Sequence, residues 1–173
     1  MITVISATNR PNNNTIRFAK KYLELLKYRK VESQLFSLGE ISGSFTLNDI
    51  YSYHHPGLQL LINKYLLPVD KLVVVVPEYN GGIPGVLKVF IDAVKPELFQ
   101  NKKVALVGIS SGRSGNLRGL DQLTNIFNYL NSEVLSYKVP VSNALSLFND
   151  SGAIIDESTI NAFELQIEKF LKY

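Results

Sequence analysis

The stretch from Lys71 to Val94 constrains the fold of this chain more than any other part of the sequence. It opens with a wholly apolar, valine-rich run over residues 72–76, which predicts a strand buried on both faces, as in a parallel sheet. Pro77 is expected to stop this strand, and residues 80–82, Asn-Gly-Gly, tolerate positive φ and leave backbone N–H groups open. A largely buried helix is predicted over residues 86–94. The succession of strand, glycine loop and helix is typical of a ligand-binding loop at the carboxyl end of a parallel strand.

The rest of the chain alternates between strand-like and helix-like patterns. Strands are expected at 2–6, 31–38, 72–76, 103–109 and 134–141, and helices at 15–28, 58–67, 86–94, 117–130 and from 157 onwards. With right-handed crossovers, this alternation predicts an α/β fold: a flavodoxin-like three-layer sandwich with a five-stranded parallel sheet in the order 2-1-3-4-5. The length of 173 residues and the lack of a linker predict a single domain over residues 1–173. Residues 39–57 give no clear pattern.

The composition excludes several classes of function. The chain has no cysteine, which excludes disulfides, thiolate metal sites and cysteine nucleophiles. His54 and His55 are adjacent and are expected in a surface loop, so no metal site is predicted. No apolar run approaches the ~20 residues of a membrane span, and the N-terminus lacks a secretion signal, so we expect a cytoplasmic protein with no membrane partner. The net charge of +3 is spread along the chain, and no nucleic-acid partner is expected.

The loop from Ser6 to Thr15 joins the first strand to the first helix. A helix N-terminus after a strand is a natural anion site, because free N–H groups and the positive end of the dipole point there. Arg10 adds a fixed charge with a forked geometry that suits phosphate. Side chains that could donate to phosphate oxygens are those of Thr8, Asn13, Asn14 and Thr15. The alternative is a loop rich in helix-capping residues with a solvated arginine.

Residues 77–92 read PEYNGGIPGVLKVFID. This sequence resembles the signature of the NADPH-dependent FMN reductases, a flavodoxin-like family whose pattern is roughly PEYNGS-x-PG-x-LK-x-x-ID. The first loop resembles the family's phosphate loop, approximately GS-x-R-x-x-S, with Thr8, Arg10 and Asn13 at the matching positions. Two residues depart from that pattern: Ala7 replaces a glycine, and Asn13 replaces a hydroxyl by an amide.

The resemblance implies that three loops hold FMN. The first would bind the phosphate, and the glycine-rich loop after residue 76 would cradle the isoalloxazine ring, where backbone N–H groups stabilise the charge of the reduced flavin. Tyr79 would form a wall against the ring or a partner subunit, and Glu78 would hold the loop or the dimer. A third loop, after residue 109, would close against the far edge of the flavin. The residues implied for the last two loops are Pro77, Glu78, Tyr79, Asn80, Gly81, Ser111 and Gly112.

The resemblance further implies an FMN-dependent NAD(P)H oxidoreductase. Hydride would pass from the nicotinamide of NADPH or NADH to flavin N5, and electrons would then pass to a small-molecule acceptor such as flavin, a quinone, an azo dye or a metal oxyanion. The flavin performs the chemistry, so no catalytic side chain is predicted. A homodimer or homotetramer is also implied. Two alternatives remain open: a flavodoxin-type electron carrier, and a flavin-free regulatory scaffold of the same fold.

Overall fold

A parallel sheet lies at the centre of the computed structural model of the chain, which describes residues 1–41, 43, 45–53 and 55–173. The strands are hydrogen-bonded in the order β2-β1-β3-β4-β5, and β6 also pairs with β4. Their bounds are β1 Ile2–Ser6, β2 Ser33–Ser37, β3 Lys71–Pro77, β4 Lys103–Ile109, β5 Glu133–Val134 and β6 Val139–Val141. The predicted flavodoxin-like order is therefore confirmed. The loop position expected for His54 falls outside the described residues.

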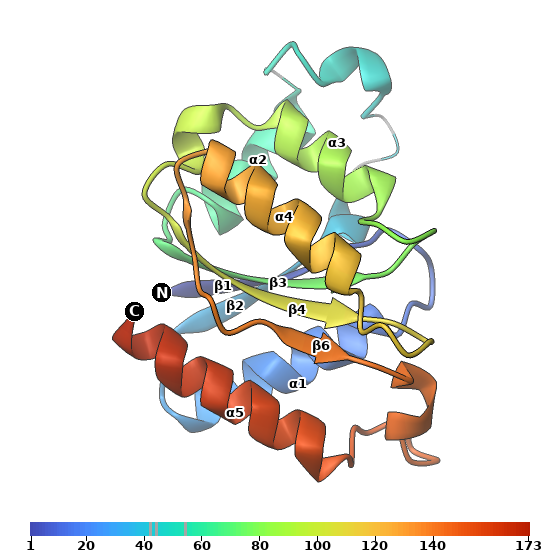
Figure 1. Ribbon diagram of the computed structural model, residues 1–173. Coiled ribbons are helices and arrows are strands. Elements are labelled where there is room, and N and C mark those ends of the chain that lie inside the picture. Colours follow the sequence, from blue (N-terminus) through green and yellow to red (C-terminus); the bar gives the residue numbers. More distant parts are fainter. Residues whose placement is uncertain (42, 44, 54) are drawn as a thin grey trace.

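Helices cover both faces of the sheet and make three layers (Figure 1). Their bounds are α1 Thr15–Tyr28, α2 Pro56–Tyr65, α3 Gly85–Ala93, α4 Leu117–Tyr129 and α5 Glu157–Lys172. In Figure 1, α2, α3 and α4 lie above the sheet, whereas α1 and α5 lie below it. Among the described residues, none of the helices combines the length and the apolar character that a membrane span requires.

The valine run of β3 is buried from both sides. One apolar cluster, between the sheet and helices α2, α3 and α4, contains Leu72, Val74 and Val76. The other cluster, between the sheet and helices α1 and α5, contains Val73 and Val75. Successive side chains of a strand point to opposite faces, so a strand covered on both sides needs a continuous apolar run. Because β3 occupies the middle of the sheet, the loop that follows it emerges at the centre of the carboxyl edge.

The last position of the sheet is where the prediction of one strand over 134–141 is wrong. Val134 lies opposite Val104 and Val139 lies opposite Val107. Between these two pairs the edge segment advances by five residues, whereas β4 advances by only three. The hydrogen-bonded ladder is therefore interrupted, and the segment forms two short strands, β5 and β6. The side-chain amide of Gln166 fills the break, because its Nε2 donates to the backbone oxygens of Leu106, at 3.0 Å, and Tyr137, at 2.8 Å.

Two other strand boundaries also differ from the prediction. Strand β3 does end at Pro77, as expected, but Pro77 itself is the last residue of the strand and lies opposite Ile109 of β4. The next N–H, that of Glu78, donates to the Ile109 oxygen, so the nitrogen of Pro77 faces away from β4, toward the side where β1 has already ended. On that side the Ala7 N–H still donates to the Val75 oxygen at 2.9 Å, and Pro77 has no N–H with which to continue this ladder. Strand β2 is shorter than the predicted 31–38 and lies at the edge of the sheet.

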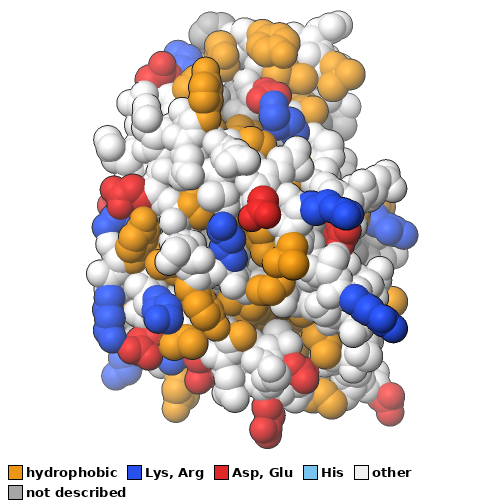
Figure 2. Space-filling view, in the orientation of Figure 1, with side chains coloured by type: hydrophobic (Ala, Val, Ile, Leu, Met, Phe, Trp, Pro, Cys, Tyr) orange, Lys and Arg blue, Asp and Glu red, His pale blue; other side chains and the backbone are white. Residues whose placement is uncertain are grey.

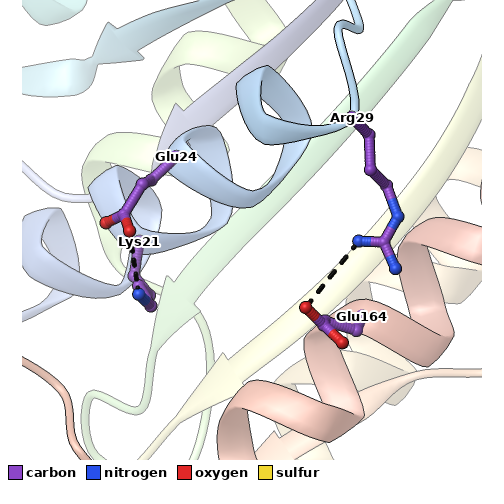
Figure 3. Close-up of polar contacts among 4 residues, drawn as sticks. All are labelled: Lys21, Glu24, Arg29 and Glu164. Atoms are coloured by element: carbon purple, nitrogen blue, oxygen red, sulfur yellow. Dashed lines mark hydrogen bonds and ion pairs between the residues drawn. The ribbon is translucent and has the colours of Figure 1, made fainter.

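Helix α1 is held over the sheet mainly by its buried face. The rings of Tyr22 and Phe163 lie 5.3 Å apart between α1 and α5, and the Tyr22 hydroxyl donates to Gln166 Oε1 at 3.0 Å. At the surface, Arg29 Nη1 lies 3.9 Å from Glu164 Oε1, and Lys21 lies 3.0 Å from Glu24 (Figure 3). Exposed ion pairs of this kind contribute little. The core therefore fixes where the N-terminus of α1 points.

Candidate functional site

A cavity of about 530 Å³ opens at the carboxyl edge of the sheet. The loops after β1, β3, β4 and β6 all leave this edge, at the right of Figure 1. The volume lies within the range of small-molecule sites. The cavity is lined by Arg10, Pro11, Asn12, Asn13, Asn14, Thr15, Pro77, Glu78, Tyr79, Ile109, Ser111, Ala144 and Leu145.

Most of the residues predicted for the site line this cavity. They are Arg10, Asn13, Asn14, Thr15, Pro77, Glu78, Tyr79 and Ser111. Four predicted residues do not belong to the wall: Thr8, Asn80, Gly81 and Gly112. Thr8 is buried behind it, Asn80 and Gly81 form a turn beyond it, and the Gly112 oxygen accepts a hydrogen bond from the Asn143 N–H at 2.8 Å.

The N-terminus of α1 offers several open donors to the cavity. The Arg10 guanidinium has no acidic partner among the described residues. Within the same part of the chain, the backbone N–H groups of Asn14 and Thr15 donate to no acceptor. The Asn13 side chain, predicted to donate to a phosphate, is instead used within the loop. Its Oδ1 accepts from the Ile16 N–H at 2.9 Å, and its Nδ2 donates to the Arg10 oxygen at 2.7 Å.

A hydrogen bond joins the loops after β1 and β3. The Thr8 hydroxyl lies 2.8 Å from the Tyr79 hydroxyl. Thr8 is 0% exposed, whereas Tyr79 is partly exposed and lines the cavity. The hydroxyl predicted to contact a phosphate is thus separated from the cavity by a tyrosine that comes from the next strand of the sheet.

Residues 79–82 form a tight hairpin turn. Asn80 has φ 52° and Gly81 has φ 77°, and Tyr79 and Gly82 exchange backbone hydrogen bonds of 3.0 and 3.1 Å. Two consecutive residues with positive φ between paired residues make a type I′ turn, for which Asn-Gly is the favoured sequence. The glycine loop is therefore an ordered turn that fixes the direction of the Tyr79 side chain.

Glu78 connects this loop with the one after β4. The Ser114 hydroxyl donates a hydrogen bond to its carboxylate. That hydrogen bond is the main reason why the pKa of the Glu78 carboxyl lies below its ordinary value, with hydrogen bonding by Ser110 and the charge of Arg118 adding to the effect. An ionised Glu78 that holds two loops together agrees with the structural role that the resemblance implies for it.

Several residues of the site were not predicted from the sequence. Asn116 has φ 62°, is fully buried, and donates from Nδ2 to the Val76 oxygen at 3.0 Å, which ties the loop after β4 to the end of β3. Asn12 also has positive φ, and its place in an Asn-rich run after a proline is a signal for this conformation. Ala144 and Leu145 follow β6, and nothing in the sequence marks them.

These residues fit a phosphate ester that carries a larger group. A guanidinium without an acidic partner and open N–H groups at a helix N-terminus suit a phosphate. The Thr15 hydroxyl, which makes no side-chain hydrogen bond within the described residues, lies at the same end of the cavity. The remaining volume extends past Glu78 and Tyr79 to Ser111, which leaves room for a ring system.

Comparisons with known proteins agree with this fit. The family model of the NADPH-dependent FMN reductases matches residues 1–146. An NAD(P)H-dependent FMN reductase of Pseudomonas aeruginosa is 30% identical over 136 residues, which cover 76% of this chain and 74% of that protein. A 2-hydroxy-1,4-benzoquinone reductase of Burkholderia sp. is 25% identical over 140 residues, covering 78% and 76% of the two chains.

The fold is also that of known flavoenzymes. The NAD(P)H:(acceptor) oxidoreductase FerB of Paracoccus denitrificans superposes with a TM-score of 0.82 at 20% identity, covering 99% of this chain and 95% of that one. The likeness extends to the whole sheet and its helices. Together with the match of the family model over most of the sequence, these findings show that the chain belongs to the NADPH-dependent FMN reductase family and is an oxidoreductase that uses FMN and NAD(P)H.

Proposed function

We propose that the cavity at the carboxyl edge of the sheet is the FMN site, with the phosphate near Arg10 and the ring beside Glu78 and Ser111. The observation that carries this proposal is made at one end of a cavity of about 530 Å³. There the Arg10 guanidinium and the N–H groups of Asn14 and Thr15 have no acidic or accepting partner in the part of the chain that the structure describes. A fixed positive charge beside the N-terminus of a helix is a combination that suits a phosphate.

The protein's own contribution to the reaction is positioning and electrostatics. When bound, FMN supplies the N5 atom that takes hydride from NAD(P)H and the ring that passes electrons on. The Glu78–Ser114 hydrogen bond keeps the loops after β3 and β4 together, and the turn at Asn80 and Gly81 keeps the wall of the cavity in place. The acceptor is a small molecule, with free flavin and quinones favoured by the reactions for which the relatives are named.

Visible spectroscopy tests this function directly. Purified protein is mixed with FMN, freed of excess ligand by gel filtration, and titrated with NADPH or NADH without oxygen. We expect a yellow protein that bleaches on addition of the reduced nucleotide and regains its colour with benzoquinone. A protein that stays colourless would favour the flavin-free scaffold, and one that is yellow but not bleached by either nucleotide would favour the electron carrier.

We also propose that the chain forms a homodimer through α3 and α4, or a tetramer built from such dimers. A second cavity of about 530 Å³, mostly apolar, lies on this side of the molecule. Its lining includes Tyr51, which is 76% exposed, and Tyr129, which is 88% exposed. Exposed aromatic groups around an apolar hollow are typical of protein interfaces. Sedimentation of the wild type and of Tyr129→Glu tests this proposal, since the variant should shift toward monomer.

A further inference from the structure

We infer that the Tyr79 hydroxyl, and not that of Thr8, donates a hydrogen bond to the phosphate of FMN, so that Tyr79 sets the preference for FMN over riboflavin. This inference rests on the proposed FMN site. It assigns a specific contact to a residue for which the resemblance implied only a wall against the ring or against a partner subunit.

The surroundings of Thr8 are the first step of the argument. Its side chain is fully buried and is absent from the cavity wall. Its Oγ1 accepts a hydrogen bond from the Arg10 N–H at 3.2 Å and lies 2.8 Å from the Tyr79 hydroxyl oxygen. No other hydrogen-bonding group of the described residues contacts this hydroxyl. The Tyr79 oxygen is therefore the acceptor available to the Thr8 hydroxyl hydrogen.

The direction of the Thr8–Tyr79 hydrogen bond follows from burial. If Tyr79 donated to Thr8, the Thr8 hydrogen would be left unpaired on a side chain that is 0% exposed, which costs free energy. If Thr8 donates to Tyr79, the Tyr79 hydrogen remains for a partner in the cavity. The second arrangement satisfies both hydroxyls once an acceptor enters, so the buried threonine orients the tyrosine as a donor.

The position of Tyr79 matches the place where a phosphate would lie. Its hydroxyl reaches across from β3 to the loop after β1, next to Arg10, and Tyr79 and Arg10 line the same cavity. The neighbouring carboxylate, that of Glu78, is hydrogen-bonded to Ser114 in the loop after β4 and does not compete for this donor. The type I′ turn at Asn80 and Gly81 fixes the backbone from which Tyr79 reaches.

A hydrogen-bond donor to the phosphate can be distinguished from a donor to the ring by comparing the binding of FMN with that of riboflavin. FMN and riboflavin share the isoalloxazine ring and the ribityl chain, and they differ only in the phosphate. Removal of a phosphate contact therefore weakens FMN binding and leaves riboflavin binding unchanged, whereas removal of a ring contact weakens both.

The experiment measures the dissociation constants of FMN and riboflavin by quenching of flavin fluorescence. The variants are Tyr79→Phe, which removes only the hydroxyl, and Thr8→Val, which keeps the shape of the side chain and removes the orienting donor. Tyr28→Phe, at the exposed far end of α1, is the matched control. Thermal unfolding of each variant, compared with the wild type, verifies that the fold is kept.

We expect Tyr79→Phe to raise the dissociation constant of FMN about tenfold, as for loss of a hydrogen bond to a charged group, with that of riboflavin unchanged. Thr8→Val should raise the FMN constant by only about threefold, since the tyrosine hydroxyl remains. An equal rise for both flavins in Tyr79→Phe would overturn the inference, as would a larger effect of Thr8→Val than of Tyr79→Phe. A wild type that binds neither flavin would contradict the proposed function and the inference together. A wild type that binds FMN, combined with an equal effect of Tyr79→Phe on both flavins, would contradict the inference alone.

Discussion

Arg10 is exposed and has no acidic partner in the described part of the chain. We therefore expect Arg10→Ala to leave stability almost unchanged but to weaken FMN binding by roughly 1–3 kcal/mol, the range for a charge-assisted hydrogen bond. Fluorescence titration at several salt concentrations measures the effect, and the salt dependence should become shallower. Lys20→Ala, an exposed cation further along α1, is the control, and equal effects of the two variants would contradict a specific contact.

The depressed pKa of Glu78 predicts how stability depends on pH. Because the carboxylate is favoured in the folded state, its hydrogen bonds add stability above its ordinary pKa of 4.5, and this contribution is lost as the pH falls below that value. Glu78→Gln should therefore melt at a lower temperature than the wild type at pH 7, and the difference should shrink below about pH 4.

Two further variants show whether this effect comes from the contact with Ser114. Ser114→Ala should reproduce the loss seen in Glu78→Gln, and the double variant should lose little more than either single variant. Glu133→Gln, an exposed carboxylate on β5, should show no such pattern. A difference between wild type and Glu78→Gln that persists unchanged at pH 3 would show that the carboxylate charge is not the cause.

Single residues of the site differ in how well the sequence predicts them: residues placed by a local pattern are predicted, whereas contacts between distant parts of the chain are not. Arg10 and the Asn-rich loop are recognisable because a strand followed by a helix N-terminus places them at an anion site whatever else surrounds them. The contact of Thr8 with Tyr79 spans 71 positions of the chain, and that of Asn116 with Val76 spans 40. Such contacts depend on how neighbouring strands are aligned, which no local pattern reports.

The turn between β3 and α3 depends on a glycine at position 81. A non-glycine residue with φ near 77° is disfavoured by about 1–2 kcal/mol. Gly81→Val should lower the free energy of unfolding by about this amount and should also weaken FMN binding, because the turn carries Tyr79. Chemical denaturation and flavin titration measure the two effects. Gly85→Ala is the matched control, since an added Cβ there would lie within 4 Å of no atom of the described residues beyond its chain neighbours and its own helix backbone, and it should be neutral or slightly stabilising.

Among the elements, β3 and β4 are the ones that the sequence predicts best. Both are central strands with uninterrupted apolar runs, which is the sequence pattern typical of a strand buried on both faces of a parallel sheet. The edge after β4 is predicted poorly, because the apolar residues of the 134–141 segment do not reveal that the segment is two residues longer than its partner. The break is stabilised by Gln166 of α5, and a sequence window around the edge strand does not contain that residue.

At the scale of the whole molecule, basic and acidic side chains are interspersed on the face shown in Figure 2. With a net charge of only +3, the attraction of an anionic nucleotide then depends on local groups such as Arg10 and the N-terminus of α1 rather than on the overall field. The site in turn depends on the core, since α1 is positioned by residues buried between α1, α5 and the sheet.

Binding at a site built from four loops should stabilise the whole domain. At a concentration of 100 times its dissociation constant, FMN should add about 2.7 kcal/mol, which for a domain of this size raises the melting temperature by roughly 5–10 °C. Differential scanning fluorimetry measures the shift. Riboflavin at the same concentration should give a smaller shift, and so should FMN with Arg10→Ala. Equal shifts in all three cases would contradict a phosphate contact at α1.

The amide of Gln166 reaches two layers of the molecule at once. It donates to the sheet through Leu106 and Tyr137 and accepts from the hydroxyl of Tyr22 on α1. In related proteins, positions 22 and 166 are therefore expected to vary together although 144 residues separate them. Phenylalanine at position 22 would leave the amide oxygen without a donor, so such relatives should carry a different residue at 166 and close the edge of the sheet in another way.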